Sequence, residues 1–257
     1  MNAIFITGTA GSGKSSLTSK MVQWYNDNQA FAITLNLDAG AINLPYTPDI
    51  DIRNYIELEK LMTEFDLGPN GALVMAADLI ATKIDEVQKE VDSINPDYVI
   101  VDTPGQIELF VYRTSGPYFV SNFQCDNKVN IFTLDGTLIS APINYVSIGL
   151  LAASVRMRLD VPQIDVMTKK DLVSERIPDI SRWSSSRVKL EEAIESRSEN
   201  QRASSDHKIL TRDILRALYR QGIISAPILY SNITMEGIVN LTGALSRILS
   251  LGEQTFD

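Results

Sequence analysis

The sequence predicts an α/β fold of three layers, in which helices cover both faces of a mostly parallel sheet. Short apolar runs typical of buried strands alternate along the chain with longer segments whose apolar residues recur at helical spacing. The chain has 257 residues, of which 44% are hydrophobic, and this is enough for the core of one large domain. We therefore expect a single domain over residues 1–257.

The expected strands are short and rich in β-branched and aromatic residues. They comprise residues 3–6, 31–37, 98–101, 129–134, 163–167 and 227–230. The expected helices comprise residues 14–26, 54–65, 70–91, 143–158, 187–197, 206–220 and 234–249. Two of these helices separate the second strand from the third, so we expect a helical insertion over about residues 50–95. In a parallel sheet, ligands bind at the carboxyl ends of the strands.

Composition excludes some classes of partner. The formal net charge is -9, from 32 acidic and 23 basic residues, which argues against a broad nucleic-acid surface. Cys125 is the only cysteine, so no intrachain disulfide can form, as in proteins of a reducing compartment. The longest apolar stretch, residues 145–155, is too short to span a bilayer, and no secretory signal pattern precedes it. We expect a cytoplasmic protein with no membrane partner, in which residues 184–205 form an exposed helix.

The pattern GxxxxGK[ST] stands at residues 8–15, between the first expected strand and the first expected helix. This is the context that a phosphate-binding P-loop requires, because its backbone N–H groups and the helix N-terminus both face the phosphates. Lys14 is expected to reach the β- and γ-phosphates, and the Ser15 hydroxyl to bind Mg²⁺. The residues expected to bind phosphate are Gly11, Ser12, Gly13, Lys14, Ser15 and Ser16. An ordinary glycine-rich turn is the alternative, but strand, loop and helix together favour the P-loop.

A second phosphate-side motif, Asp-Thr-Pro-Gly-Gln, follows the strand at residues 98–101. A carboxylate at the end of a buried strand, here Asp102, can hold Mg²⁺ directly or through water. Gly105 lacks a Cβ, so its N–H can approach the γ-phosphate. The Gln106 amide can orient an attacking water because it both donates and accepts hydrogen bonds. Alone, the motif would read as a turn; beside a P-loop it predicts a hydrolytic site.

A third motif, Thr168-Lys169-Lys170-Asp171, follows the strand at residues 163–167. The Asp171 carboxylate can accept hydrogen bonds from the ring N–H and the exocyclic amine of guanine, whereas adenine presents the opposite pattern. The Lys169 stem can cover the base. Thr168 replaces the commoner asparagine, and we expect one weaker supporting hydrogen bond. Ser231, within the segment Tyr230-Ser231-Asn232 after the last strand, is expected at the base. A polar turn with an Asp N-cap, and a plain loop at Ser231, are the alternatives.

A further motif, Gly68-Pro69-Asn70, lies within the helical insertion. As a helix–helix connector, Gly68 would close one helix with positive φ, Pro69 would prevent continuation and Asn70 would cap the next helix. With the other motifs in order, the chain resembles the GPN-loop GTPases, most of all the short archaeal members. These are dimeric P-loop GTPases of the SIMIBI class, related to signal-recognition and MinD-type proteins. The resemblance covers nearly the whole chain and rests on residues 8–15, 35–38, 49–53, 68–70, 102–106 and 168–171.

The resemblance implies a homodimer in which Gly68, Pro69 and Asn70 of one subunit reach the active site of the other. It implies that Asn70 contacts phosphate or the bound water there, and that Asp38 and Asp102 lie near Mg²⁺ and the attacking water. The implied catalytic residues are Asp38, Asn70, Asp102 and Gln106, and the implied metal site comprises Ser15, Asp38 and Asp102. One departure is Ala39-Gly40 after Asp38, where the family usually has Pro-Ala. No arginine occupies a finger position; Arg53 and Arg113 are expected in structural ion pairs.

The motifs and the resemblance lead to three functional hypotheses. The leading hypothesis is a Mg²⁺-dependent enzyme that hydrolyses GTP to GDP and works as a homodimeric switch. The resemblance adds a protein client, such as an RNA polymerase assembly. The first alternative is a P-loop kinase that transfers phosphate to a small molecule or a nucleic-acid end. The second is a nucleotide-dependent assembly scaffold with little hydrolysis.

Overall fold

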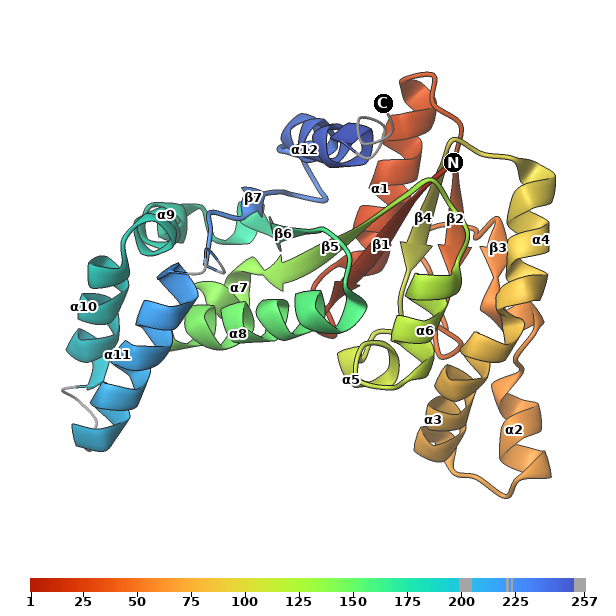
Figure 1. Ribbon diagram of the computed structural model, residues 1–257, viewed down its shortest axis with the longest axis horizontal. Coiled ribbons are helices and arrows are strands. Elements are labelled where there is room, and N and C mark those ends of the chain that lie inside the picture. The colour runs from red at the N-terminus through yellow and green to blue at the C-terminus, as the bar shows by residue number, and fades with distance from the viewer. Residues whose placement is uncertain (199–204, 221, 223, 252–257) are drawn as a thin grey trace.

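The computed structural model of the chain describes residues 1–198, 205–220, 222 and 224–251. Within these residues, a sheet of seven strands has the order β3-β2-β4-β1-β5-β6-β7, and every neighbouring pair is parallel (Figure 1). The strands are β1 (Asn2–Gly8), β2 (Ala32–Asn36), β3 (Ile50–Asp51), β4 (Tyr98–Asp102), β5 (Asn127–Asp135), β6 (Gln163–Thr168) and β7 (Ile228–Leu229).

Helices connect the strands and cover the sheet. The α-helices are α1 (Lys14–Asp27), α2 (Leu58–Glu64), α3 (Pro69–Leu79), α4 (Ile84–Ile94), α5 (Ile107–Phe110), α6 (Ser115–Asn122), α7 (Gly136–Ile139), α8 (Pro142–Leu159), α9 (Ile177–Ser185), α10 (Arg187–Ser198), α11 (Ser205–Arg220) and α12 (Ile238–Leu251). Short 3₁₀ turns are η1 (Ile52–Asn54), η2 (Ile80–Lys83), η3 (Lys170–Leu172) and η4 (Ser174–Arg176).

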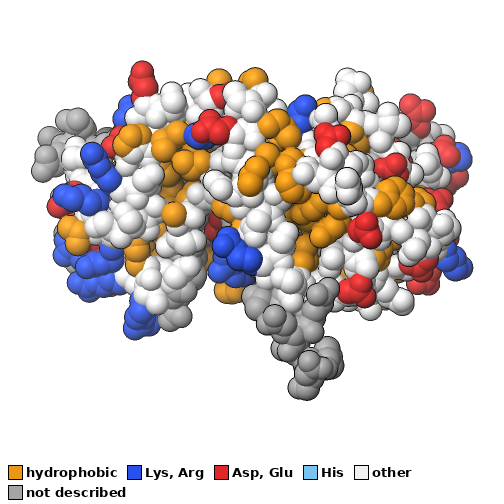
Figure 2. All heavy atoms as spheres, turned by 90° about the horizontal axis from the view of Figure 1, so that it is seen from above, with side chains coloured by type: hydrophobic (Ala, Val, Ile, Leu, Met, Phe, Trp, Pro, Cys, Tyr) orange, Lys and Arg blue, Asp and Glu red, His pale blue; other side chains and the backbone are white. Residues whose placement is uncertain are grey.

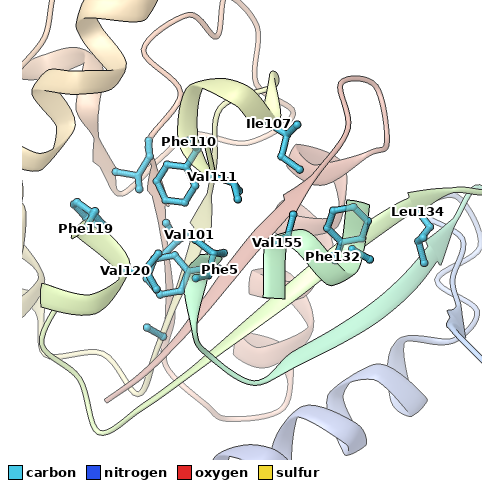
Figure 3. Packing of buried hydrophobic residues seen from close by; sticks show 14 of the residues in the cluster. Phe5, Val101, Ile107, Phe110, Val111, Phe119, Val120, Phe132, Leu134 and Val155 are labelled. Atoms are coloured by element: carbon cyan, nitrogen blue, oxygen red, sulfur yellow. The ribbon is translucent and has the colours of Figure 1, made fainter. Parts of the chain in front are cut away.

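The central strand β1 contributes side chains to two separate hydrophobic cores, because successive side chains of a strand point to opposite faces of the sheet. Ala3 and Phe5 belong to one buried cluster, which α6 and α8 help to close (Figure 3). Ile4 and Ile6 belong to the other, which lies under α1 and α12. Burial on both faces explains why β1 and its neighbours are nearly continuous apolar runs. The predicted three-layer α/β fold is confirmed.

The strand register brings the ends of four strands to the same edge of the sheet. Ile6 of β1 pairs with Asp102 of β4, and Gly8 pairs with Thr133 of β5. Asn36 of β2 also pairs with Asp102. Strands β2 to β4 lie on one side of β1 and β5 to β7 on the other, so the order of the strands reverses at β1. A crevice at such a reversal is the usual ligand site of an open parallel sheet.

Several expected elements differ in detail. The helix expected over residues 54–65 is the 3₁₀ turn η1 followed by α2, and the helix expected over residues 70–91 is divided by η2 into α3 and α4. At that division the Thr82 hydroxyl donates to Leu79 O at 2.7 Å, a side-chain bond that competes with α-helical pairing. Strand β3 and helices α5, α6, α7 and α9 were not predicted, because each has nine residues or fewer.

The stretch 184–205 is more than an exposed helix. Leu190 and Ile194 of α10 are buried against the core, at 0% and 8% exposure. The many serines and charged residues of this stretch obscure these anchors in the sequence, and residues 199–204 lie outside the described residues. The two expected ion pairs are present, since Arg53 pairs with Asp51 and Arg113 with Asp78.

Charge is unevenly distributed over the surface. Figure 2 shows Lys and Arg side chains gathered at the end that carries α10 and α11, and Asp and Glu side chains at the opposite end. Several of the arginines are paired with carboxylates, for example Arg187 with Glu191 and Arg212 with Glu195. The absence of a broad nucleic-acid surface therefore stays a prediction. Among the helices described, none combines the length and apolarity needed to cross a membrane.

Candidate active site

The P-loop is held in place by β5. Gly8 has a φ of +150°, and a Cβ there would lie 2.1 Å from Thr133 Oγ1, so only glycine fits. The Ser12 and Thr133 hydroxyls are hydrogen-bonded at 2.6 Å. Gly13, at φ +88°, is the left-handed residue that precedes α1. These contacts fix the loop before any ligand binds, which lowers the entropic cost of binding phosphate.

Lys14 lies inside this loop. Its side chain is 5% exposed, and Nζ donates to Gly8 O, Thr9 O and Gly105 O at 3.2, 3.0 and 3.2 Å. Burial lowers the pKa of Lys14, while the carboxylates of Asp102 and Asp38 act in the opposite direction. The ammonium thus connects the P-loop to the loop after β4.

Asp102, at the end of β4, is almost fully buried at 1% exposure. Its Oδ2 accepts a hydrogen bond from the Tyr46 hydroxyl at 2.9 Å, whereas its buried Oδ1 has no hydrogen-bond partner within the described residues. Burial raises the pKa of Asp102 to about 6, against the lowering influence of the Ser15 and Tyr46 hydroxyls and of Lys14. A buried carboxylate oxygen without a partner is destabilising, and a cation beside it would compensate.

Asp38 joins the loop after β2 to the loop after β4. Its Oδ2 accepts from the Gly105 N–H at 3.0 Å, and its Oδ1 from the Gly40 N–H at 2.9 Å. The expected position of Asp38 at the ligand edge of the sheet is therefore correct. The Gly105 N–H, expected to face the γ-phosphate, here donates to Asp38 instead.

These residues surround a cavity of about 590 Å³. Seven of its lining residues were predicted from the sequence: Gly11, Gly13, Lys14, Ser15, Ser16, Asp38 and Gly105. Four were not: Asn43, Leu44, Pro45 and Thr103. Its size suits the phosphates and sugar of a nucleotide.

The third motif lies beside the P-loop. The Thr168 hydroxyl donates to Ser12 O at 2.6 Å, so threonine retains a direct link to the P-loop where we expected a weaker support. Asp171 is exposed, and its Oδ1 accepts from the Ser231 hydroxyl at 2.5 Å. Lys169 Nζ donates to Asp135 Oδ2 at 2.6 Å. The chain thus brings Thr168, Lys169, Asp171 and Ser231 together at the expected edge.

Asn232 belongs to the loop that was expected at the base, but its contact with the P-loop was not predicted. A Cβ on Gly13 would lie 3.0 Å from its Nδ2, so its amide packs directly against the P-loop. Its Oδ1 is buried and has no partner among the described residues. The signal available in the sequence was only its place after Ser231, following the last strand.

The Gly68-Pro69-Asn70 segment stands apart from the cavity. In Figure 1 the connection between α2 and α3 lies at the bottom edge of the molecule, and all three residues are exposed. The expected positive φ at Gly68 is wrong, because Asp66 has it instead, at +51°. Gly68 is the N-cap of α3 at φ −71° and ψ 168°, the extended conformation that a following proline imposes.

Asn70 is therefore the second residue of α3 and not its cap. Within its own chain it neither lines the cavity nor makes a hydrogen bond among the described residues. Leu73, one turn further along α3, does contact the site indirectly: a Cβ on Gly40 would lie 2.5 Å from Leu73 Cδ2. The helix that begins with this segment thus packs against the residues that follow Asp38.

Gln106 is exposed and precedes the short helix α5. It follows Gly105 directly but is not among the residues that line the cavity. The role of its amide in orienting water therefore stays a prediction.

The residues present suit Mg²⁺ bound together with a nucleotide. The described residues contain no cluster of three or more His, Cys, Asp or Glu side chains that would hold a metal alone. Mg²⁺ in nucleotide sites needs only one or two carboxylates, a hydroxyl, waters and substrate phosphates. Ser15, Asp38 and the unpartnered oxygen of Asp102 match that donor set.

Tyr46 is a further residue of the site that was not predicted. Burial beside the Asp102 carboxylate raises the pKa of its hydroxyl, so the hydroxyl remains a donor. The available signal was an aromatic residue after a proline, between the strand end at Asp38 and the Asp-Ile-Asp-Ile-Arg segment.

A parallel sheet with a P-loop after its central strand, and a strand-end carboxylate beside it, defines a P-loop nucleotide-binding protein. A family model described as "Conserved hypothetical ATP binding protein" matches residues 6–250. A GPN-loop GTPase of Pyrococcus abyssi is 34% identical over 177 residues, which cover 68% of this chain and 69% of that protein. The chain belongs to the GPN-loop GTPase family.

Other relatives agree with this assignment. GPN-loop GTPase 1 of Dictyostelium discoideum is 35% identical over 67% of this chain but 44% of its own length. The chain thus spans about half the length of the first curated relatives it matches. The crystal structure of a GTPase in apo form from Pyrococcus abyssi superposes with a TM-score of 0.81 at 26% identity, covering 96% of this chain and 97% of that one.

Proposed function

We propose that this protein is a Mg²⁺-dependent GTPase that works as a homodimeric switch. The observation that carries the proposal is the convergence of three loops on one cavity. Lys14 and Ser15 come from the P-loop, Asp38 from the loop after β2, and Gly105 from the loop after β4. Such an arrangement suits phosphoryl transfer, in which catalysis is almost entirely positioning and charge stabilisation.

Guanine is the proposed base. The exposed Asp171 carboxylate is oriented by Ser231 at 2.5 Å and can accept from both the ring N–H and the exocyclic amine of guanine. Against adenine the same carboxylate would face an acceptor, which costs binding free energy. The family model's description mentions ATP and the curated relatives are named GTPases, so a direct comparison of the two nucleotides is the sharpest test.

The proposed mechanism assigns a task to each residue of the site. Lys14 and the P-loop N–H groups stabilise charge on the phosphate oxygens. Binding of phosphate gives the Lys14 ammonium an anionic partner in place of the three carbonyls that it contacts here. Ser15, Asp38 and Asp102 would hold Mg²⁺, which supplies charge neutralisation between the phosphates when bound. Asp38 and Gln106 orient the attacking water.

Asn70 is proposed to act in trans. Its exposure, and its separation from the cavity of its own chain, are what a residue needs to reach a second copy. In that arrangement Gly68 and Pro69 determine the path by which the segment approaches the partner. The chain acts as a single P-loop GTPase domain over residues 1–257, in the cytoplasm. Assistance to the assembly of a protein client, such as an RNA polymerase, rests on the family resemblance alone.

Binding and turnover of GTP and ATP by the purified protein test this function. We expect GTP and GDP to bind at least about a hundredfold more tightly than ATP in calorimetric titration. Phosphate should be released from GTP in buffer without any acceptor, and chelation of Mg²⁺ should abolish the release. Equal binding of ATP would contradict the role of Asp171. Release only in the presence of an acceptor would favour a kinase, and tight binding with no release would favour a scaffold.

A further inference from the structure

We propose that Tyr46 is a positioning residue of the cation site: its hydroxyl fixes the Asp102 carboxylate and couples that carboxylate to the loop over the phosphate cavity. The loop comprises residues 38–49 and is called the Tyr46 loop below. This inference rests on the proposed use of Mg²⁺ with a nucleotide. It assigns a task to a residue outside the P-loop, Asp102–Gln106 and Thr168–Asp171 motifs.

The contact between the two side chains is specific in its geometry. The Tyr46 hydroxyl lies 2.9 Å from Asp102 Oδ2, and the carboxylate is 1% exposed, so water does not compete for this bond. The other oxygen, Oδ1, makes no hydrogen bond within the geometric limits among the described residues, although the Ser15 hydroxyl is near enough to lower the pKa of the carboxylate. With one oxygen held by a donor, the carboxylate cannot rotate freely, and the second oxygen remains available to a cation or its bound water.

The Tyr46 loop is anchored on both sides of the tyrosine. Before it, Arg53 Nη1 donates to Ala41 O at 2.8 Å, and Ser19 of α1 donates to Pro45 O at 3.3 Å. After it, Asp49 accepts from the Thr34 N–H and hydroxyl at 2.7 and 2.8 Å. The backbone on both sides of Tyr46 is therefore held by contacts that do not involve Asp102, and this backbone positions the hydroxyl.

The same loop forms one wall of the phosphate cavity. Asn43, Leu44 and Pro45 line it opposite Lys14, Ser15 and Ser16, and Tyr46 follows directly. The cation and the Tyr46 hydroxyl both act on the Asp102 carboxylate, so the Tyr46–Asp102 hydrogen bond and cation binding are thermodynamically linked. Loss of the hydroxyl should weaken cation-assisted binding more than binding of the nucleotide alone.

The test is the substitution Tyr46→Phe, read out as the affinity for GDP with Mg²⁺ and with a chelator in calorimetric titration. We expect the affinity in chelator to change by less than about twofold. The gain in affinity on adding Mg²⁺ should fall about tenfold, which corresponds to about 1.4 kcal/mol and to the lower range for a hydrogen bond to a charged group. Tyr112→Phe is the matched control. It also removes a tyrosine hydroxyl, which donates to the Ser154 hydroxyl at 2.8 Å, and Tyr112 does not line the cavity.

A double-mutant cycle separates positioning from a general loss of packing. In the Asp102→Asn background, Tyr46→Phe should not change the Mg²⁺ gain further, because the carboxylate that it positions is absent. An unchanged Mg²⁺ gain in Tyr46→Phe, or an equal further loss in the Asp102→Asn background, would overturn the inference. Failure of the proposed function is a separate result, since it would show as absent GTP preference or absent hydrolysis in the unmodified protein.

Discussion

The phosphate edge and the Gly68-Pro69-Asn70 tip are built in opposite ways. At the phosphate edge several polar groups are already paired within the chain: Lys14 contacts three carbonyls, and Asp38 holds the Gly105 N–H. At the tip all three residues are exposed. The first region is preorganised within one chain, whereas the second is open to contact with another molecule.

This difference has a consequence for what mutations should do. Changes at the phosphate edge remove groups that hold three loops together, so binding, catalysis and stability should all respond. Changes at the tip should leave the isolated chain intact and alter only what depends on a second molecule. The following predictions run from the largest expected effect to the smallest.

Lys14→Ala should reduce GTP hydrolysis about a thousandfold, because it removes the buried cation that faces the developing charge. A cooperative thermal transition should remain, since the P-loop is also held by the Ser12–Thr133 bond. Steady-state phosphate release measures the effect, with Lys89→Ala on the exposed face of α4 as the control. Activity within tenfold of the unmodified protein would mean that Lys14 is not the main electrostatic group.

Asp102→Asn should stabilise the nucleotide-free protein while abolishing Mg²⁺-dependent hydrolysis. The pKa of Asp102 is raised to about 6 from 3.8, so the folded protein holds this proton more tightly than the unfolded chain does. The stability that the bound proton contributes is fully present below about pH 3.8 and is lost as the pH rises through 6. The variant should exceed the parent in free energy of unfolding by up to about 3 kcal/mol at neutral pH, and by less at about pH 5. Urea unfolding at several pH values measures this; a constant difference would contradict it.

Asp171→Asn should weaken GTP binding about a hundredfold and leave ATP binding nearly unchanged. The ratio of the two affinities is the informative quantity, because a structural defect would lower both. Ser231→Ala should reproduce a small part of the effect by releasing the carboxylate that it orients. Asp27→Asn, at the exposed end of α1, is the matched charge control.

Asn70→Ala should lower hydrolysis about tenfold without changing GTP affinity or thermal stability, since the side chain makes no hydrogen bond among the described residues. Mixing it with Lys14→Ala sharpens the comparison between the two regions. A mixed dimer would combine one intact P-loop with an intact Asn70 from the partner, so activity should rise above that of either variant alone. No recovery, in a mixture shown to exchange subunits, would mean that Asn70 does not act in trans.

The parts of the site that were predictable are those that follow a strand directly. Lys14, Asp102 and Asp171 each stand at a fixed offset from a buried apolar run, and parallel strands bring such positions to one edge. Tyr46 was not predictable in this way, because its contact with Asp102 spans 56 residues and depends on the path of an irregular loop. The same limit applies to Asn232 against Gly13, where a loop and not a strand places the side chain.

Within the insertion, local sequence preferences correctly predicted that Gly68-Pro69-Asn70 connects two helices, but they predicted the wrong backbone conformation for Gly68. Gly68 was expected to take positive φ because glycine does so at helix ends, but Pro69 restricts the residue before it to extended conformations. Asp66 takes the left-handed conformation instead. The break at Ile80–Lys83 had no Gly or Pro to mark it, so periodicity alone suggested one long helix.

The support that β5 and β6 give to the P-loop has a consequence for the order in which the protein is made. The Ser12 hydroxyl bonds Thr133, 121 residues later, and the Ser12 carbonyl accepts from Thr168, 156 residues later. During synthesis the P-loop leaves the ribosome before β5 and β6, so these bonds cannot form until both strands have been translated. Folding with such distant partners is slow. The P-loop can thus reach its working conformation only after β5 and β6 are present, so a product truncated before these strands would carry the motif without the site.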